Sequence, residues 1–115
     1  MEVEVQQSRL AKALSNMSKI AASTRAGLPI LSNVLLRASD KSLVLTATNL
    51  EIAIVEYVNA KIIKAGTLTV PAKLLADFVS NLPKEDVNLK ATGDKMVVKC
   101  GAYKSMINGI LADDY

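Results

Sequence analysis

A change of hydrophobic pattern that occurs twice, in the same order, constrains the fold of this chain more than any other feature. Val3 and Val5 alternate with acidic residues as in a half-buried strand, and from Ser8 onward apolar residues follow at helical spacing. Ser8 is the expected N-cap of this helix. Three segments rich in Leu, Ile and Val, typical of strands, follow at residues 30–37, 42–48 and 51–58.

The second half of the chain repeats this order. Residues 62–70 are strand-like, Pro71 stands where a first helical turn tolerates a missing N–H, and Pro83 closes the helix. The apolar face of this helix comprises Leu74, Leu75, Phe78, Val79 and Leu82. Three more short strands are predicted at residues 87–91, 96–100 and 103–107.

Two short segments also resemble each other across the halves. Leu36–Lys41 matches Leu89–Lys95 apart from one inserted Gly, which suggests an internal duplication. We therefore predict a single α+β domain over residues 1–115, built from two βαβββ-like halves, with two helices packed on one face of antiparallel sheet. This order of elements argues against alternating βαβ units with a long parallel sheet.

Positive charge is concentrated in the first third of the chain. The whole sequence has 14 basic and 11 acidic residues, but residues 1–39 have five basic and two acidic ones, and residues 40–115 have nine of each. The predicted first helix has a polar stripe with spacings of 3, 4 and 3 residues: Arg9, Lys12, Asn16 and Lys19. A local field of one sign points to a polyanion such as nucleic acid.

Few residues are available for catalysis or metal binding. The chain has no His, which excludes histidine triads, imidazole bases and His-ligated metals. Its single Cys, Cys100, can form no intramolecular disulfide and lies in an apolar alternation, where a buried small hydrophobe is expected. Glu2 and Glu4 could share a divalent cation, but a solvated strand face is far commoner. We therefore predict no catalytic residue, no metal and no cofactor.

The sequence also carries no sign of export or membrane insertion. Its start lacks the basic and apolar segments of a signal peptide, and no run approaches the roughly 18 apolar residues of a spanning helix. A single Cys suits a reducing compartment, so we expect a soluble, cytoplasmic protein with no membrane partner. Three Tyr and one Phe are too few for single-strand recognition by base stacking.

Several segments resemble one family along the whole chain. They match, in order and spacing, the N-terminal domain of the bacterial sliding clamp, the beta subunit of DNA polymerase III: Leu28–Leu36, Asp40, Thr46–Glu51, Val70–Lys73 and Ala112–Tyr115. The resemblance implies the DNA-clamp fold, with this chain as the first of three clamp domains and without the second and third. It also implies a ring homodimer that encircles duplex DNA without sequence specificity and tethers the replicative polymerase.

Such a protein is a processivity factor and not an enzyme. The partners implied for the full-length protein are duplex DNA, a second clamp chain, DNA polymerase III and the clamp loader. The isolated domain is expected not to close a ring.

The resemblance also assigns roles to single residues. Arg25 matches a DNA-contacting Arg of the family, Lys12 matches a Lys that lines the hole, and Lys73 stands near the hole, where relatives are often basic. Ser80 replaces an Arg of some relatives, so the first helix should provide most of the attraction. With the two other cations of the stripe, the predicted DNA-binding residues are Arg9, Lys12, Lys19, Arg25 and Lys73.

The last predicted strand is implied to form the ring interface, because in the family its edge pairs with the third domain of the neighbouring chain. The resemblance assigns an ionic contact to Lys104 and an apolar plug to Ile107. Tyr103 and Met106 lie on the same strand and are included in the predicted interface. The alternatives are a solvent-facing Lys104 and an Ile107 in the core.

Two other function classes remain open. A protein-interaction module would use the sheet edge, and its basic stripe would be an ordinary solvated face. A small carboxylate hydrolase or nuclease would need several acids and a metal at close range, and the sequence offers no such cluster at a recognisable spacing.

Overall fold

The computed structural model describes residues 1–22, 32–39, 42–49 and 51–112. Within these ranges the chain forms two helices and nine strands, in the order β1 Glu2–Gln6, α1 Gln7–Ala22, β2 Asn33–Ser39, β3 Ser42–Thr48, β4 Ala53–Asn59, β5 Lys61–Lys64, β6 Gly66–Pro71, α2 Ala72–Ser80, β7 Asp86–Thr92, β8 Lys95–Cys100 and β9 Tyr103–Asn108. The predicted order of strands and helices is confirmed, with one additional strand in the middle of the chain.

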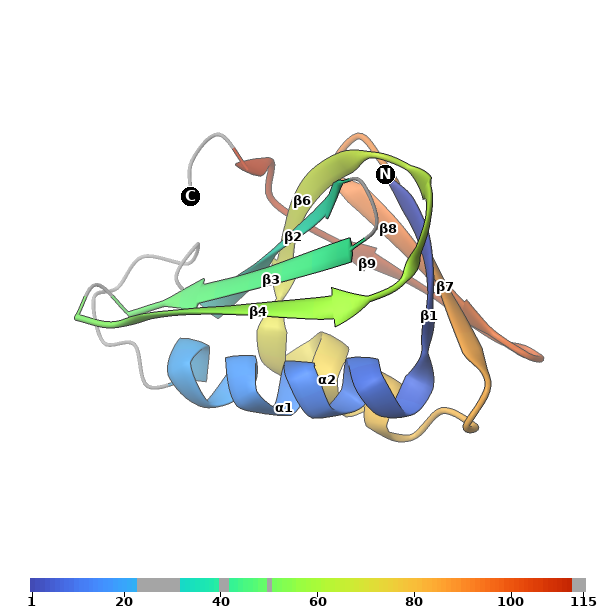
Figure 1. Cartoon of the computed structure of the whole chain (residues 1–115), viewed down its shortest axis with the longest axis horizontal. Coiled ribbons are helices and arrows are strands. Elements are labelled where there is room, and N and C mark those ends of the chain that lie inside the picture. Colours follow the sequence, from blue (N-terminus) through green and yellow to red (C-terminus); the bar gives the residue numbers. More distant parts are fainter. Residues whose placement is uncertain (23–31, 40–41, 50, 113–115) are drawn as a thin grey trace.

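The strands form two antiparallel sheets rather than one. The five-stranded sheet has the order β5-β1-β7-β8-β9 and the four-stranded sheet has the order β4-β3-β2-β6. Figure 1 shows both helices on the same side of the strands, with α2 behind α1. The predicted α+β class with its helix pair is therefore confirmed, and the duplicated halves share strands between the two sheets.

The additional strand arises where residues 62–70 were predicted to be one strand. In the structure β5 pairs with β1 in the five-stranded sheet, whereas β6 pairs with β2 in the four-stranded sheet, so the chain crosses between sheets at Ala65. Gly66 permits this crossing, because a Cβ at this position would lie 2.9 Å from the Cβ of Met1. A continuous apolar run carries no local signal for such a break.

The start of α1 and one residue of α2 also differ from prediction. Helix α1 begins at Gln7, so Ser8 lies exposed in its first turn and the prediction of Ser8 as N-cap is wrong. Gln7 is buried, and its Nε2 donates a hydrogen bond of 2.8 Å to the backbone oxygen of Val79 at the end of α2, which satisfies the buried amide. Leu74, predicted on the apolar face of α2, is 55% exposed.

One core lies between the helices and the sheets. Leu10, Leu14 and Met17 of α1 are fully buried, as is Leu75 of α2, and alternate residues of both sheets complete the cluster. Burial of these apolar side chains is the main source of stability for a domain of this size. Neither α1 nor α2 has the length and apolar character that crossing a membrane requires.

Cys100 belongs to this core, as predicted. Its Sγ lies 3.6 Å from the backbone oxygen of Pro83, to which the thiol donates. Burial, with a smaller contribution from the nearby carboxylate of Glu85, raises the pKa of the Cys100 thiol above its ordinary value. The thiol therefore stays protonated at neutral pH and is a packing residue.

Candidate nucleic-acid interface

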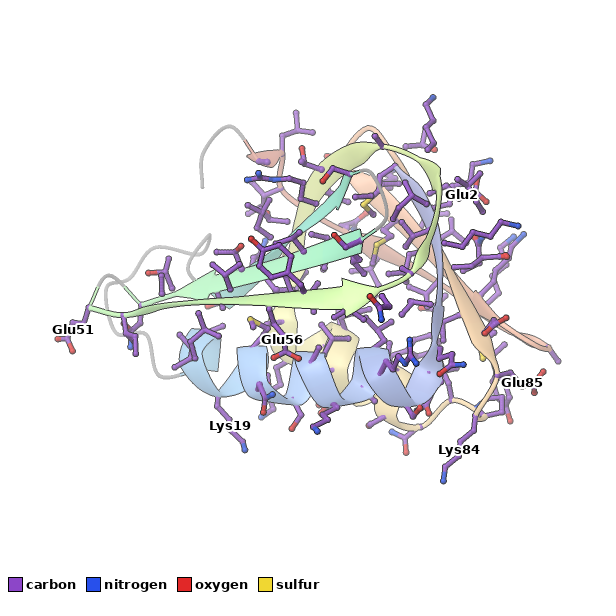
Figure 2. All side chains as sticks on the ribbon, viewed as in Figure 1. Glu2, Lys19, Glu51, Glu56, Lys84 and Glu85 are labelled. Atoms are coloured by element: carbon purple, nitrogen blue, oxygen red, sulfur yellow. The ribbon has the colours of Figure 1, made fainter. Side chains whose placement is uncertain are left out.

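The exposed side of α1 presents the predicted basic stripe. Arg9, Lys12 and Lys19 are all exposed, and the intervening Asn16 is exposed as well. The first turn of α1 contains no acid and its last turn contains Lys19. Figure 2 shows the Lys19 side chain pointing away from the strands. The stripe predicted from spacing alone is therefore confirmed as a continuous solvent-facing surface, which we call the α1 basic face and define as Arg9, Lys12, Asn16 and Lys19.

The two helices are fixed to each other at the start of α1. The buried Gln7 side chain contacts the end of α2, and the Gln7 backbone N–H donates to the backbone oxygen of Glu85 at 3.1 Å. These two bonds hold the first turn of α1 against the segment that follows α2. The α1 basic face is thus presented from a helix that is joined to α2 at its start.

The exposed side of α2 carries less positive charge than that of α1. Lys73 is exposed in its first turn, and Asp77 is exposed four residues later on the same side. Ser80 is exposed, and its hydroxyl donates to the backbone oxygen of Asp77 at 2.9 Å. The helix therefore adds one cation and one anion to this side of the molecule, which agrees with the prediction that α1 dominates.

One further cation lies on the helix side. Lys84 comes after the end of α2 and borders a surface hollow that Gln7 and Ser8 also line. Figure 2 shows Lys84 and Lys19 pointing away from the strands on the same side of the molecule. The backbone hydrogen bond from Gln7 to Glu85, the next residue, places Lys84 near the α1 basic face, which its position in the sequence does not indicate. Arg25, the Arg implied by the family resemblance, lies outside the described residues.

An acid also reaches the α1 basic face. Glu56 of β4 is half-buried, and its Oε1 accepts a hydrogen bond of 3.2 Å from Nδ2 of Asn16. It lines a surface hollow together with Arg9 and Lys12. Sequence spacing does not indicate this contact between Asn16 and Glu56, because 40 residues separate the two partners.

The second predicted surface, the edge of β9, has its residues on two different sides. Tyr103 and Met106 are 57% and 63% exposed, and Lys104 is exposed as well. Ile107 is 4% exposed and belongs to the core, which favours the core alternative for this residue. Strand β9 pairs with β8 and is the last strand of its sheet, so one row of its backbone groups faces outward.

Lys104 lies near other lysines on the outer face of this sheet. It lies directly opposite Lys99 of β8 in the antiparallel register, and both side chains are exposed. Lys90 and Lys95 line the same groove on the outer face of the sheet. Like charges directly opposite each other are unfavourable in a sheet, so this face is suited to an acidic partner. The charge count did not reveal this group of lysines, because residues 40–115 contain equal numbers of basic and acidic residues.

No group of three Asp, Glu, Cys or His residues is close enough to hold a metal ion within the described ranges. Glu2 accepts a hydrogen bond from Nδ2 of Asn88 at 3.0 Å, across the pairing of β1 with β7. This contact ties Glu2 into the sheet as an ordinary polar residue.

Comparison with known proteins gives consistent matches. A family model described as DNA polymerase III beta subunit, N-terminal domain, matches residues 1–115. The Beta sliding clamp of Synechococcus elongatus is 36% identical over 118 residues, covering 100% of this chain and 31% of that protein. The Beta sliding clamp of Synechocystis sp. is 38% identical over 124 residues, covering 100% of this chain and 32% of that protein.

The fold of this chain also matches that of a solved structure. The DnaN sliding clamp of Bartonella birtlesii, bound to griselimycin, superposes with a TM-score of 0.94 at 33% identity, over 100% of this chain and 31% of that one. The chain thus spans less than a third of the length of these relatives. Its two sheets, its helix pair and its sequence agree in one assignment: this chain belongs to the DNA polymerase III beta subunit family of sliding clamps and matches the N-terminal domain of that family.

Proposed function

We propose that residues 1–115 form the first domain of a ring-shaped processivity clamp, which encircles duplex DNA and tethers the replicative polymerase without catalysing a reaction. The observation that carries this proposal is the α1 basic face, an acid-free helix surface with three exposed cations. Membership of the sliding-clamp family supports the same function. Because the proposed partner is duplex DNA, the proposed place of action is the cytoplasm.

The α1 basic face would hold DNA weakly and without reading its sequence. Exposed Lys and Arg attract phosphates through water, and salt screens this attraction over about 8–10 Å. Contacts to phosphates carry no sequence information, so they can be remade at each step along the duplex. In this proposal Arg9, Lys12 and Lys19 form the main contact, and Arg25 and Lys73 add to it.

The outer face beside β9 would form the ring joint with a second clamp chain. Lys104, which lies opposite Lys99 and lines one groove with Lys95, calls for acidic residues on the opposing surface. The exposed Tyr103 and Met106 supply apolar contact area next to the free strand edge. Ile107 would support this edge from within the core. Ring closure requires the clamp's other domains, so this chain alone should remain an open arc.

A duplex titration over a range of salt concentrations tests the DNA-binding proposal. We expect weak binding, with log K falling against log salt at a slope of at most roughly 3–4, because each neutralised phosphate contributes about 0.9 and about four cations take part. A slope near ~8 would mean that another surface binds DNA.

Charge reversal locates the binding surface. Lys12→Glu combined with Arg25→Glu should abolish measurable binding at moderate salt. The matched control, Lys95→Glu with Lys99→Glu, makes the same change of net charge on the outer sheet face and should retain most of the binding. If the first pair has no effect, the basic stripe is an ordinary solvated face and the chain is an interaction module acting through its sheet edge.

Ring topology needs a separate experiment. Circular and linearised duplexes should release this chain at the same rate, since an open arc can leave either one sideways. Retention on circles that is lost after linearisation would contradict the proposal that the other clamp domains are needed for closure.

A further inference from the structure

Glu56 occupies an unusual place for an acid. In β4, Ile54, Glu56 and Val58 are more buried than the residues between them, so this side of the edge strand faces α1. Figure 2 shows the labelled Glu56 beside the helix. Its Oε1 accepts from Asn16, a member of the α1 basic face. The fold therefore brings a carboxylate to the one helix surface that the sequence keeps free of acids.

The neighbours of Glu56 identify the cation on which it acts. Arg9 and Lys12 line the same hollow as Glu56. Arg9 also borders a second hollow, which Glu4, Asp86 and Lys61 line as well, so Glu56 is one of several charged residues around it. Of the acids lining the described hollows, Glu56 is the one that accompanies Lys12. Lys12 is therefore the cation on which we expect Glu56 to act.

We propose that Glu56 is a counter-charge that limits the attraction of the α1 basic face for duplex DNA and holds Asn16 in a fixed orientation. This inference rests on the proposed function. A phosphate that approaches Lys12 is attracted by the lysine and repelled by Glu56, which lines the same hollow. The attraction is therefore shallower than the count of cations suggests.

A shallow attraction suits translation along DNA. Each phosphate contact must break before the next can form, so a deep free-energy minimum at one cluster of cations would slow the movement of the clamp along DNA. A fixed counter-ion reduces the depth without removing the cations. Glu56 also restrains the Asn16 amide, which would otherwise be free to donate hydrogen bonds to phosphate oxygens.

The test removes the charge and keeps the hydrogen bond. Glu56→Gln retains an oxygen that can accept from Asn16, so the thermal midpoint should stay close to that of the unchanged chain. Duplex affinity should rise roughly two- to fivefold at low salt, and the difference should vanish at high salt because screening removes it. Glu51→Gln is the matched control: it makes the same change of charge at the far end of the β3–β4 hairpin and should change affinity little.

A double-mutant cycle gives the decisive readout. In a Lys12→Gln background the gain from Glu56→Gln should shrink to the size of the Glu51→Gln effect, since the two charges act on the same phosphate. An equal gain in both backgrounds, or no gain at all, would overturn the inference. If charge reversal at Lys12 and Arg25 weakens binding while Glu56→Gln is silent, only the role of Glu56 fails and the proposed function stands.

Discussion

Helices α1 and α2 occupy matching places in the two halves of the molecule, yet they differ in what they present to solvent. Both bury an apolar side in the common core, and they lie next to each other on one side of the strands. Helix α1 has 16 residues and exposes three cations, whereas α2 has 9 residues and exposes one cation, Lys73, beside one acid, Asp77. The packing role is duplicated and the electrostatic role is not.

The difference follows from what each side of a helix must satisfy. The buried side is held by close packing, where even one methylene is felt, so both halves keep the same apolar spacing. The exposed side changes stability little, so its charges can diverge. A duplicated fold can therefore carry an unequal function, and each side can be tested separately.

The largest expected effect tests the shared packing. Leu14→Ala in α1 and Leu75→Ala in α2 each remove a fully buried side chain, and each should lower the free energy of unfolding by about 2–5 kcal/mol. Urea unfolding followed by circular dichroism measures both. Ser15→Ala, on the exposed side of α1, is the control and should stay within about 0.5 kcal/mol. A silent truncation in either helix would mean that this helix does not share the core.

The next effect concerns the bond that joins the helices. Gln7→Ala removes the buried hydrogen bond to the backbone oxygen of Val79, and should lower the free energy of unfolding by about 1–2 kcal/mol. The loss is limited because that oxygen also accepts from the Leu82 backbone N–H. Gln6→Ala changes the same residue type at an exposed neighbour and should have almost no effect. Equal losses at both positions would show that the bond contributes nothing specific.

Gln7 also illustrates what the sequence could and could not predict. Apolar periodicity predicted the α+β class, the order of elements and the α1 stripe, because these depend on residues close together in the chain. The burial of Gln7 depends on Val79, 72 residues away, and the crossing at Ala65 depends on strand pairing in two different sheets. Local patterns contain neither kind of information.

The same reasoning applies to the candidate site. Arg9, Lys12 and Lys19 were predictable because one helix carries them all. Lys84 and Glu56 join the surface only through tertiary contacts, so no spacing rule could include them. Likewise Ile107 is a core residue because alternation along β9 directs it inward, whereas the family resemblance assigned it by position alone.

A smaller effect tests whether α2 can be given the electrostatic role of α1. Asp77→Lys replaces the exposed acid of α2 by a cation, and should strengthen duplex binding roughly three- to fivefold at low salt, with a salt slope steeper by about 1. Ser80 and Asn81 donate to the backbone oxygen of Asp77 and not to its carboxylate, so these bonds survive the substitution and folding should be unaffected. Asp94→Lys, in the β7–β8 turn, is the matched control. An unchanged slope in the α2 variant would mean that its exposed side does not face the duplex.

The smallest effect comes from a difference inside the core. The inward positions of β3 end at Ala47, which cannot titrate, whereas those of β8 end at Cys100. Because burial raises the pKa of the Cys100 thiol, the folded chain holds this proton more tightly than the unfolded chain. The contribution to stability is complete below the ordinary thiol pKa of about 8.5 and is lost as pH rises from there through the folded value.

Cys100→Ala isolates this contribution, since other groups of both proteins titrate alike over the same range. The variant loses some stability at every pH through the lost packing, so the relevant quantity is how its deficit changes between neutral pH and about pH 9.5. That deficit should narrow as pH rises, because only the unchanged chain has a thiol to deprotonate on unfolding. A constant deficit would mean that Cys100 is no harder to ionise than a thiol in water, and the core of the second half would then be as insensitive to pH as the core around Ala47.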